Sequence, residues 1–382
     1  MKAEEKETLY AARYCSLTSV PAFLDQHSEL QCVDLSGNQL TSLPESLENL
    51  VHLRELYLEE NQLTSLPESL GNLSGLERLH LDANRLTMLP ESMSGLTRLA
   101  TLRLYGNQLR SLPASIGQLT ELKDLSLGHN QLASLPESLW QLSGLQSLNL
   151  AENQFSSLSE DIGNLINLHM LDLGHNKLTS LPDALSKLNK LTFLYLSNNR
   201  LTALAESLFA DLENLVYLNV TDNQLTALPE SLGRLTKLKE LRVYNNHLAS
   251  LLNSLGNLTN LRELHAMNNQ LTALPASIGR LKSLKELRLS DNRLTALPDS
   301  LGGLTQLTSL DLRNNQLRVL PTSLGNLTRL EHLDLRANRL RSLPASLEKL
   351  TNLEKLDVRW NELYSLPTWF HRLEKRGCLV YL

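Results

Sequence analysis

The side chains that could do chemistry are few, and they stand far apart along the chain. The cysteines are Cys15, Cys32 and Cys378, and the tripeptide Gly-His-Asn occurs twice, with its histidine at His129 and His175. A zinc ion holds its ligands at about 2 Å, so these histidines could share one ion only if the fold placed them side by side. The sequence has no glycine-rich phosphate loop, no paired-cysteine motif and no nucleophile elbow. What these groups can do therefore depends on the elements that position them.

An asparagine recurs along the chain with a spacing of 23 residues that is broken only once. One interval, between Asn199 and Asn223, is 24 residues long, and the extra residue falls in segment 205–215. The recurring asparagines are Asn38, Asn61, Asn84, Asn107, Asn130, Asn153, Asn176, Asn199, Asn223, Asn246, Asn269, Asn292, Asn315, Asn338 and Asn361. In a typical repeat, the residues that recur from one repeat to the next are Leu53, Leu56, Leu58, Asn61, Leu63, Leu66, Pro67, Leu70 and Leu73. These fifteen repeats predict a solenoid in which each unit packs on the next.

The pattern inside one repeat predicts its local structure. Leucines alternate with variable residues at the start, which indicates a short strand with one buried face. The proline after Leu66 and a return of roughly a dozen residues favour short 3₁₀ turns over long α-helices. The asparagine side chain can hydrogen-bond backbone groups that the turn leaves unpaired. His129 and His175 would then lie two strands apart, about 10 Å, which is too far for one zinc ion.

The repeat L-x-x-L-x-L-x-x-N-x-L, followed by an LPxSLGNL tail, resembles the leucine-rich-repeat family over residues 15–382. The resemblance implies an α/β fold, a right-handed solenoid of horseshoe form. A parallel β-sheet would line the concave face, with short 3₁₀ or extended segments on the convex face. It also implies a protein-binding function. The tail and the repeat length are similar to those of bacterial and intracellular members.

The two ends of the chain differ from the repeats between them. Residues 1–29 are expected to form an N-terminal cap and a degenerate repeat, with a helix over Lys2–Arg13 because good helix formers are dense there. Residues 30–375 hold the fifteen repeats, and residues 376–382 are expected to end in a capping strand. Within the repeats, Ser159, Ala205 and Leu252 replace the proline, and Ala266 replaces a core leucine or valine. The insertion at 205–215 is expected to bulge on the convex side.

Leucine, asparagine and proline positions build the scaffold, so function is expected at the variable strand positions. Several of these positions form an apolar stripe across the middle of the predicted sheet: Met170, Phe193, Tyr195, Tyr217, Tyr244 and Met267. Aromatic residues and methionine are enriched where proteins bind one another. They also suit strands in general, so the stripe has a structural explanation as well as a functional one.

Two charged rows accompany this stripe. Arg313, Arg336 and Arg359 stack beside a row of aspartates, with Trp360 at the rim. Further towards the middle of the sheet, a row of acidic residues lies beside a row of basic ones. The acidic row is Glu240, Glu263 and Glu286, and the basic row is Arg242, His265 and Arg288. Opposite charges in neighbouring rows could simply neutralise each other on a solvated surface, or they could steer a charged partner. We predict that the aromatic stripe, the arginine row and Trp360 bind a protein partner.

One catalytic resemblance conflicts with the repeat. Cys32-Val33-Asp34 resembles the Cys-x-Asp signature of a bacterial family of repeat-containing ubiquitin ligases. In that family the motif lies in a separate helical domain, whereas here it falls on the first full strand. We therefore expect no enzyme activity, no cofactor and no metal site.

Composition limits the partners and the compartment. The net charge of −5 gives no general attraction to nucleic acid. No apolar run reaches the roughly 18 residues of a membrane helix, so neither nucleic acid nor a membrane is an expected partner. The odd cysteine count and the charged N-terminal residues, which do not resemble a secretory signal, favour the cytoplasm, or delivery into a host cell as an effector. A monomer is favoured, with the oligomeric state left open.

Three functions compete on this basis. The leading one is a protein-recognition scaffold or bacterial effector that acts through its concave face. The second is the substrate-recognition arm of a separate enzyme, a ubiquitin ligase or a phosphatase, which co-purification would reveal. The third is a surface spacer, against which the lack of an export signal argues.

Overall fold

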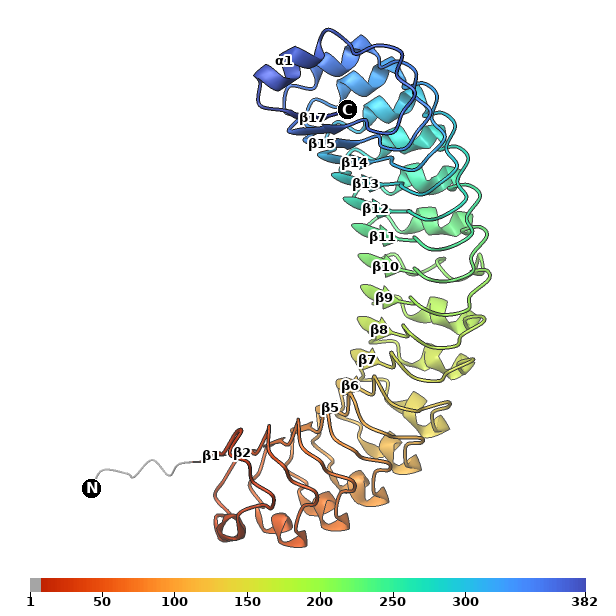
Figure 1. Ribbon diagram of the computed structural model, residues 1–382. Coiled ribbons are helices and arrows are strands. Elements are labelled where there is room, and N and C mark those ends of the chain that lie inside the picture. Colours follow the sequence, from red (N-terminus) through yellow and green to blue (C-terminus); the bar gives the residue numbers. More distant parts are fainter. Residues whose placement is uncertain (1–7) are drawn as a thin grey trace, which may run out of the picture. The chain divides into compact units, whose positions relative to one another are not determined.

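The computed structural model describes residues 8–382 and divides the chain into two compact units, Met1–Leu178 and Thr179–Leu382. In both, every repeat contributes one three-residue strand and a return segment, most often through a five-residue 3₁₀ turn (η). Strands lie on one side of each unit and the 3₁₀ turns on the other (Figure 1). The first seven residues, which include part of the expected N-terminal helix, lie outside the described residues.

Unit 1 alternates strands and 3₁₀ turns in chain order. Its strands are β1 (Leu9–Ala11), β2 (Cys32–Asp34), β3 (Glu55–Tyr57), β4 (Arg78–His80), β5 (Thr101–Arg103), β6 (Asp124–Ser126), β7 (Ser147–Asn149) and β8 (Met170–Asp172). Its 3₁₀ turns are η1 (Ala22–Gln26), η2 (Glu45–Asn49), η3 (Glu68–Asn72), η4 (Glu91–Gly95), η5 (Ala114–Gln118), η6 (Glu137–Gln141) and η7 (Glu160–Asn164).

Unit 2 continues the alternation and ends in the one α-helix of the described residues. Its strands are β9 (Phe193–Tyr195), β10 (Tyr217–Asn219), β11 (Glu240–Arg242), β12 (Glu263–His265), β13 (Glu286–Arg288), β14 (Ser309–Asp311), β15 (His332–Asp334), β16 (Lys355–Asp357) and β17 (Leu379–Tyr381). Its helical elements are η8 (Asp183–Lys187), η9 (Glu230–Arg234), η10 (Asn253–Asn257), η11 (Ala276–Arg280), η12 (Asp299–Gly303), η13 (Thr322–Asn326), η14 (Ala345–Lys349) and α1 (Phe370–Lys375).

The strands pair in parallel and in register, as the repeat predicts. Leu241 of β11 lies opposite Leu264 of β12, which lies opposite Leu287 of β13. These leucines have no exposed surface, and each contributes roughly 1.5–3 kcal/mol by burial. The first and third residues of each strand point to the opposite side. We call the surface formed by these residues, and by the residue two positions after each strand, the strand face of its unit.

The recurring asparagines tie each coil to the one before it. The side-chain nitrogen of Asn61 donates to the carbonyls of Leu35 and Leu58 at 3.0 and 3.1 Å, and its oxygen accepts from the amide of Leu40 at 3.0 Å. Asn61 is only 7% exposed. A buried backbone group left unpaired costs about 1–3 kcal/mol, so the asparagine supplies partners where the turn has none.

The residue before each asparagine adopts a left-handed backbone conformation, which the sequence analysis did not anticipate. The φ angle is +53° at His129 and +54° at His175. Glycine, asparagine and aspartate tolerate this region best, and several repeats place one there, such as Gly106 at +70°. The Gly-His-Asn tripeptides therefore occupy a turn that all repeats share.

The extra residue between Asn199 and Asn223 is absorbed in the return segment. Strands β9 and β10 still pair in register, with Tyr217 opposite Phe193. The segment beginning at Glu206 forms consecutive turns in place of the usual five-residue 3₁₀ turn. Leu208 and Phe209 remain buried in this segment, at 2% and 0% exposed. The core therefore continues through the insertion.

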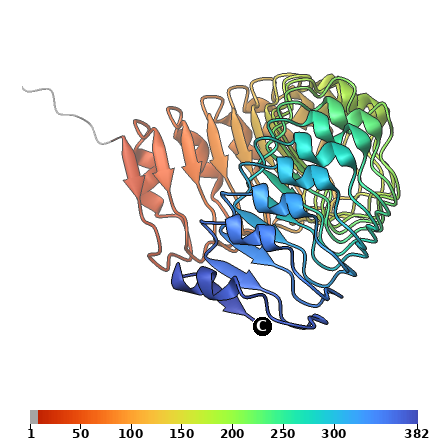
Figure 2. The same ribbon diagram turned by 90° about the horizontal axis from the view of Figure 1, so that it is seen from above.

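The expected helix over Lys2–Arg13 is wrong for the part that the structure describes. Leu9–Ala11 forms strand β1, which pairs with β2 and covers its edge. Backbone pairing outweighs the modest helix propensity of this short segment. At the other end, Leu379–Tyr381 forms a strand paired with β16. The preceding helix α1, which was not predicted, packs beside it (Figures 1 and 2).

We expect Gly279→Ala to destabilise unit 2 by about 1–3 kcal/mol. A Cβ atom there would lie 2.2 Å from the backbone oxygen of Ser300 in the next 3₁₀ turn, so the backbone would have to shift. Urea unfolding measures the change in free energy. Gly75→Ala is the matched control, because its Cβ would meet no atom closer than 3.4 Å. Equal stability of the two variants would contradict this account of the turn packing.

Candidate functional site

The strand face of unit 2 carries a cluster of three aromatic rings. The rings of Tyr195 and Tyr217 lie 4.8 Å apart, and those of Phe193 and Tyr217 lie 6.5 Å apart. Phe193 is 42% exposed, which is unusual for so large an apolar ring on a regular strand. The parallel pairing of β9 and β10 places these residues side by side. We call Phe193, Tyr195 and Tyr217 the aromatic cluster.

Charged side chains border this cluster on the side of β11. The Arg242 guanidinium lies 5.8 Å from the centre of the Tyr217 ring, within the range of a cation–π contact. Burial raises the pKa of the Tyr217 hydroxyl above its ordinary value of 10.0, and the group carries its proton at neutral pH in either case. The hydroxyl can therefore act as a hydrogen-bond donor towards a partner.

The other members of the predicted apolar stripe are less closely associated with this cluster. Tyr244 and Met267 line an open hollow together with Arg288, Asp311 and Arg313. Met170 lies on β8, in unit 1. The structure therefore brings three of the six stripe residues into direct ring contact within unit 2.

The arginine row is paired with aspartates within the chain. Arg336 donates from Nε to Oδ1 and from Nη2 to Oδ2 of Asp334, and its Nε also lies 3.4 Å from Asp357. Arg359 contacts the same Asp357 at 2.7 Å, and this aspartate has no exposed side-chain surface. Arg313 is looser, 3.6 Å from Asp311 and 44% exposed. Arg336 and Arg359 thus compensate a buried charge, and Arg313 is the member with most freedom to meet a partner.

Aromatic rings flank the end of this row. The Arg359 guanidinium lies 5.3 Å from the Trp360 ring and 5.1 Å from the Tyr381 ring. Trp360 is 70% exposed and has a φ angle of +60°, a conformation that is costly for a bulky residue. It directly follows Arg359, the last member of the arginine row.

We expect Asp357→Asn to lower the stability of unit 2 by about 2–3 kcal/mol at neutral pH, because two arginines would lose a buried partner. Burial on its own would raise the pKa of Asp357, but hydrogen bonds and charge from Arg359, with Arg336, hold it below the ordinary value of 3.8. The carboxylate therefore stabilises the fold above that value. This contribution disappears as the pH falls through the lowered pKa.

Urea unfolding of both proteins at pH 7 and in strong acid measures this effect as a difference in free energy. The difference should shrink in acid. Asp211→Asn, which changes an exposed carboxylate, is the control and should stay close to the parent protein. A difference between Asp357→Asn and its parent that is the same at both pH values would contradict this assignment.

The row of glutamates on β11, β12 and β13 is only partly neutralised. Arg242 pairs with Glu240 at 2.5 Å, and Arg288 pairs with Glu286. The middle residue, Glu263, has His265 as its nearest basic group, at 3.5 Å. Burial, followed by the charges of Glu240 and Glu286, raises the pKa of Glu263. In the charged ladder expected from the sequence, the central glutamate is thus paired with a histidine, whereas the outer two are paired with arginines.

The Cys-x-Asp motif in unit 1 is part of the scaffold. Val33 is fully buried, and Asp34 is 1% exposed and bonded to Ser36 and Arg13 at 2.6 Å each. Burial, followed by the charge of Glu55, raises the pKa of the Cys32 thiol to about 11. A nucleophilic cysteine needs the opposite shift. The geometry gives this motif a structural role.

His129 takes part in a small polar network. Its ring stacks on Tyr105 at 5.6 Å, and its Nδ1 lies 2.7 Å from Glu152. The Tyr105 hydroxyl also donates to Glu152, at 3.0 Å. Across the described residues, the groupings with three possible metal ligands in reach of one another do not include His129 or His175.

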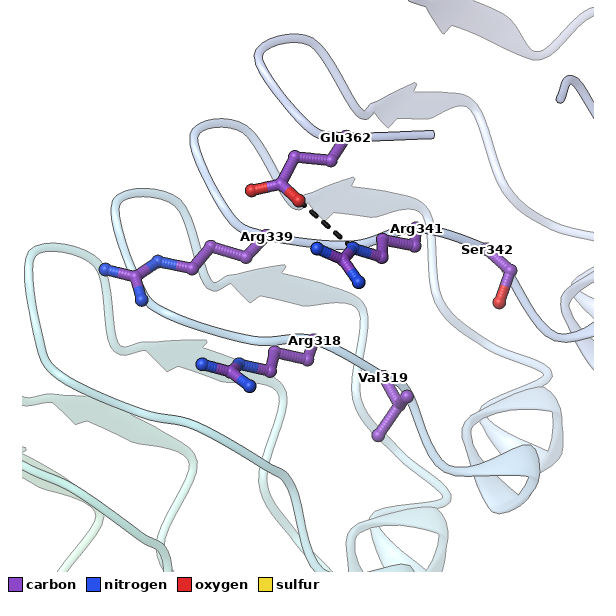
Figure 3. Close-up of a pocket in the computed structure, with 6 residues that line it drawn as sticks. All are labelled: Arg318, Val319, Arg339, Arg341, Ser342 and Glu362. Carbon is purple, nitrogen blue, oxygen red and sulfur yellow. Dashed lines mark hydrogen bonds and ion pairs between the residues drawn. The ribbon is translucent and has the colours of Figure 1, made fainter. Parts of the chain in front are cut away.

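A group of arginines on the flank of unit 2 was not predicted from the sequence. Arg318, Arg339 and Arg341 line a hollow of about 480 Å³ beside Val319 and Glu362. Figure 3 shows the three guanidinium groups on neighbouring coils, with Glu362 reaching only Arg341. The signal was present in the sequence, because Arg318 and Arg341 occupy the same position of consecutive repeats.

Comparison with known families settles what kind of protein this is. A model of the leucine-rich repeat region matches residues 12–150, 133–266 and 245–375. The chain belongs to the leucine-rich-repeat family. The family's repeat explains the strand, the buried asparagine and the 3₁₀ return described above. A comparison with curated proteins finds no match.

Solved structures of leucine-rich-repeat proteins are similar over nearly the whole chain. A leucine-rich-repeat protein of Leptospira interrogans is 36% identical, with a TM-score of 0.91, and the match covers 97% of this chain and 95% of that one. The plant peptide hormone receptor RGFR1, solved in complex with RGF2, is 31% identical with a TM-score of 0.81. That match covers 95% of this chain and 61% of the receptor chain. An internalin of Listeria monocytogenes shares the fold, with 24% identity and a TM-score of 0.68. The match covers 90% of this chain and 89% of the internalin chain.

Leucine-rich-repeat folds are general scaffolds for protein–protein interaction, and most members of the family are interaction modules without catalytic activity. Among the described residues, no helix has both the length and the apolar character needed to cross a lipid bilayer.

Proposed function

We propose that this protein is a non-catalytic recognition module that binds a protein partner on the strand face of unit 2. The observation that carries the proposal is the aromatic cluster, in which an exposed Phe193 rests on Tyr217. Clustered aromatic rings supply large apolar contact area at low conformational cost and are typical binding hot spots. Nothing in the scaffold pattern requires them at these positions.

The surroundings of the cluster suit the rim of an interface. Arg242 and Glu240 lie beside it on β11, and the looser Arg313 lies further along the same face. A central apolar contact with a charged border is the usual arrangement at protein interfaces. Charged groups at such a border raise the rate of association and select the partner. The complex of the plant receptor RGFR1 with RGF2 supports the use of this fold for binding.

The alternative is a substrate-recognition arm that works with a separate enzyme, of the ubiquitin ligase or phosphatase type. The structural basis is the same strand face, and the difference lies in the identity of the bound protein. We further infer a bacterial protein that acts in the cytoplasm or as an effector in a host cell. The Leptospira relative supports the bacterial origin.

A photo-crosslinking residue in place of Phe193 tests the proposal in the cell of origin. We expect a defined covalent adduct with one protein from this position. Tyr364, 76% exposed on the flank near Arg341, is the matched control position and should give no such adduct. Equal adducts from both positions, or adducts from Tyr364 alone, would place the partner elsewhere. A catalytic domain in the adduct would favour the recognition-arm alternative.

A further inference from the structure

A nearly buried histidine points into the row of glutamates on the strand face of unit 2. His265 is 6% exposed, and its Nε2 atom is buried without a hydrogen-bond partner in the described part of the chain. Its nearest neighbours are carboxylate oxygens, Oε2 of Glu263 at 3.5 Å and Oε1 of Glu286 at 3.7 Å. A buried nitrogen left unpaired costs about 1–3 kcal/mol. The imidazole nitrogen and the two carboxylates therefore face one another across distances that a shared cation could bridge.

Three glutamates surround this position because their strands pair in register. Glu240, Glu263 and Glu286 lie opposite one another on β11, β12 and β13. Arg242 and Arg288 take the outer two, and the central Glu263 has neither arginine as an ion-pair partner. Counted formally, the three carboxylates and the two guanidinium groups carry a charge of −3 + 2 = −1. A cation placed beside Glu263 would relieve this charge.

The spacing of the ligand atoms matches a transition-metal ion. Zinc binds histidine nitrogen and carboxylate oxygen at about 2.0–2.2 Å, so tetrahedral ligands lie about 3.3–3.6 Å apart. The 3.5 Å between His265 Nε2 and Glu263 Oε2 falls in this range. Glu240 is the third possible ligand: one ligand atom from each of Glu240, Glu263 and His265 lies within 4.8 Å of the other two. A small rotation of the long Glu240 side chain would close the remaining gap.

We propose that His265, Glu263 and Glu240 bind a divalent transition-metal ion of the zinc type on the strand face of unit 2. The Nε2 atom of His265 is buried, has no hydrogen-bond partner among the described residues and is therefore available to ligate. Glu240 keeps its contact with Arg242 through one oxygen and ligates through the other, since a carboxylate accepts several bonds. The fourth position of the ion faces the strand face, open to water or to a ligand from a partner.

This site goes beyond the protein-binding function and is tested without any partner. The purified full chain, freed of metal by dialysis against a chelator, is titrated with ZnCl₂ by calorimetry. We expect one equivalent of zinc to bind to the parent protein. His265→Ala and Glu263→Gln should each weaken that binding by at least about tenfold. Cobalt chloride gives a second readout, because tetrahedral Co²⁺ has visible absorption bands that should appear in the parent and vanish in both variants.

His129→Ala is the matched control, since His129 also lies beside a glutamate but belongs to no set of three possible ligands within residues 8–382. It should keep the zinc equivalent and the cobalt bands. Glu263→Gln preserves side-chain size, so it keeps the test informative if His265→Ala fails to fold. Zinc binding of equal strength in the parent, His265→Ala and Glu263→Gln would overturn the proposal, and so would a parent protein that binds no zinc.

Discussion

Replacing Phe193 and Tyr217 together with alanine should weaken binding of the strand-face partner by about a hundredfold or more. Hot-spot aromatics cost about 2 kcal/mol or more each when truncated, and 1.4 kcal/mol is a factor of ten in affinity. Truncation of neighbouring rings is not additive, because the two rings contact each other at 6.5 Å. The partner obtained by crosslinking, titrated by calorimetry or biolayer interferometry, provides the measurement.

Tyr105→Ala is the control for this prediction. Tyr105 is also an exposed aromatic residue, 38% exposed, but it belongs to the strand face of unit 1. Its loss should change the affinity little. Circular dichroism and urea unfolding must show that the double variant is folded, since Tyr217 also packs on Tyr195. A folded double variant that binds as tightly as the parent protein would remove the aromatic cluster from the interface.

Arg336 and Arg359 are poor choices for a parallel binding test. Both compensate the buried Asp357, so reversing their charge would change stability together with any interface. Arg313→Glu is the cleaner substitution, because Arg313 is 44% exposed and lies 3.6 Å from its aspartate. If the arginine row steers the partner, this single change should lower the association rate more than it raises the dissociation rate.

The coil-by-coil architecture could be predicted because each periodic residue type has one local role. A leucine at the strand centre, such as Leu264, can only face the core, and an asparagine such as Asn269 satisfies backbone groups of its own coil and the one before it. A repeat therefore fixes its own strand and its pairing. Register and parallel pairing follow from the 23-residue spacing, and the single 24-residue interval left both intact.

The parts that could not be predicted depend on contacts that do not repeat. Residues Leu9–Ala11 form a strand because the edge of β2 needs a partner, a fact that composition does not reveal. The pairing of Arg336 with two aspartates depends on side-chain rotamers across neighbouring strands. His265 appeared in the sequence as one member of a charged ladder, and only its burial reveals the unpaired nitrogen.

Asn246→Ala should destabilise unit 2 by about 3–5 kcal/mol, the largest stability effect expected from one substitution here. Its side-chain nitrogen donates to the carbonyls of Val220 and Val243 at 3.0 and 3.1 Å, and its oxygen accepts from the Leu225 amide at 2.9 Å. The side chain is 4% exposed, so water cannot take its place. Each backbone group left unpaired costs about 1–3 kcal/mol. Urea unfolding gives the loss of free energy.

The effect should also be local, which separates it from a general loss of packing. In a solenoid each coil contacts only its neighbours, so hydrogen exchange should quicken first at the amides of Leu225 and the coils on either side. Asn260→Ala is the matched control, because Asn260 is exposed and donates one hydrogen bond to the carbonyl of Thr236. It should cost less than about 1 kcal/mol. Similar losses for Asn246→Ala and Asn260→Ala would mean that the buried asparagines are not what joins one coil to the next.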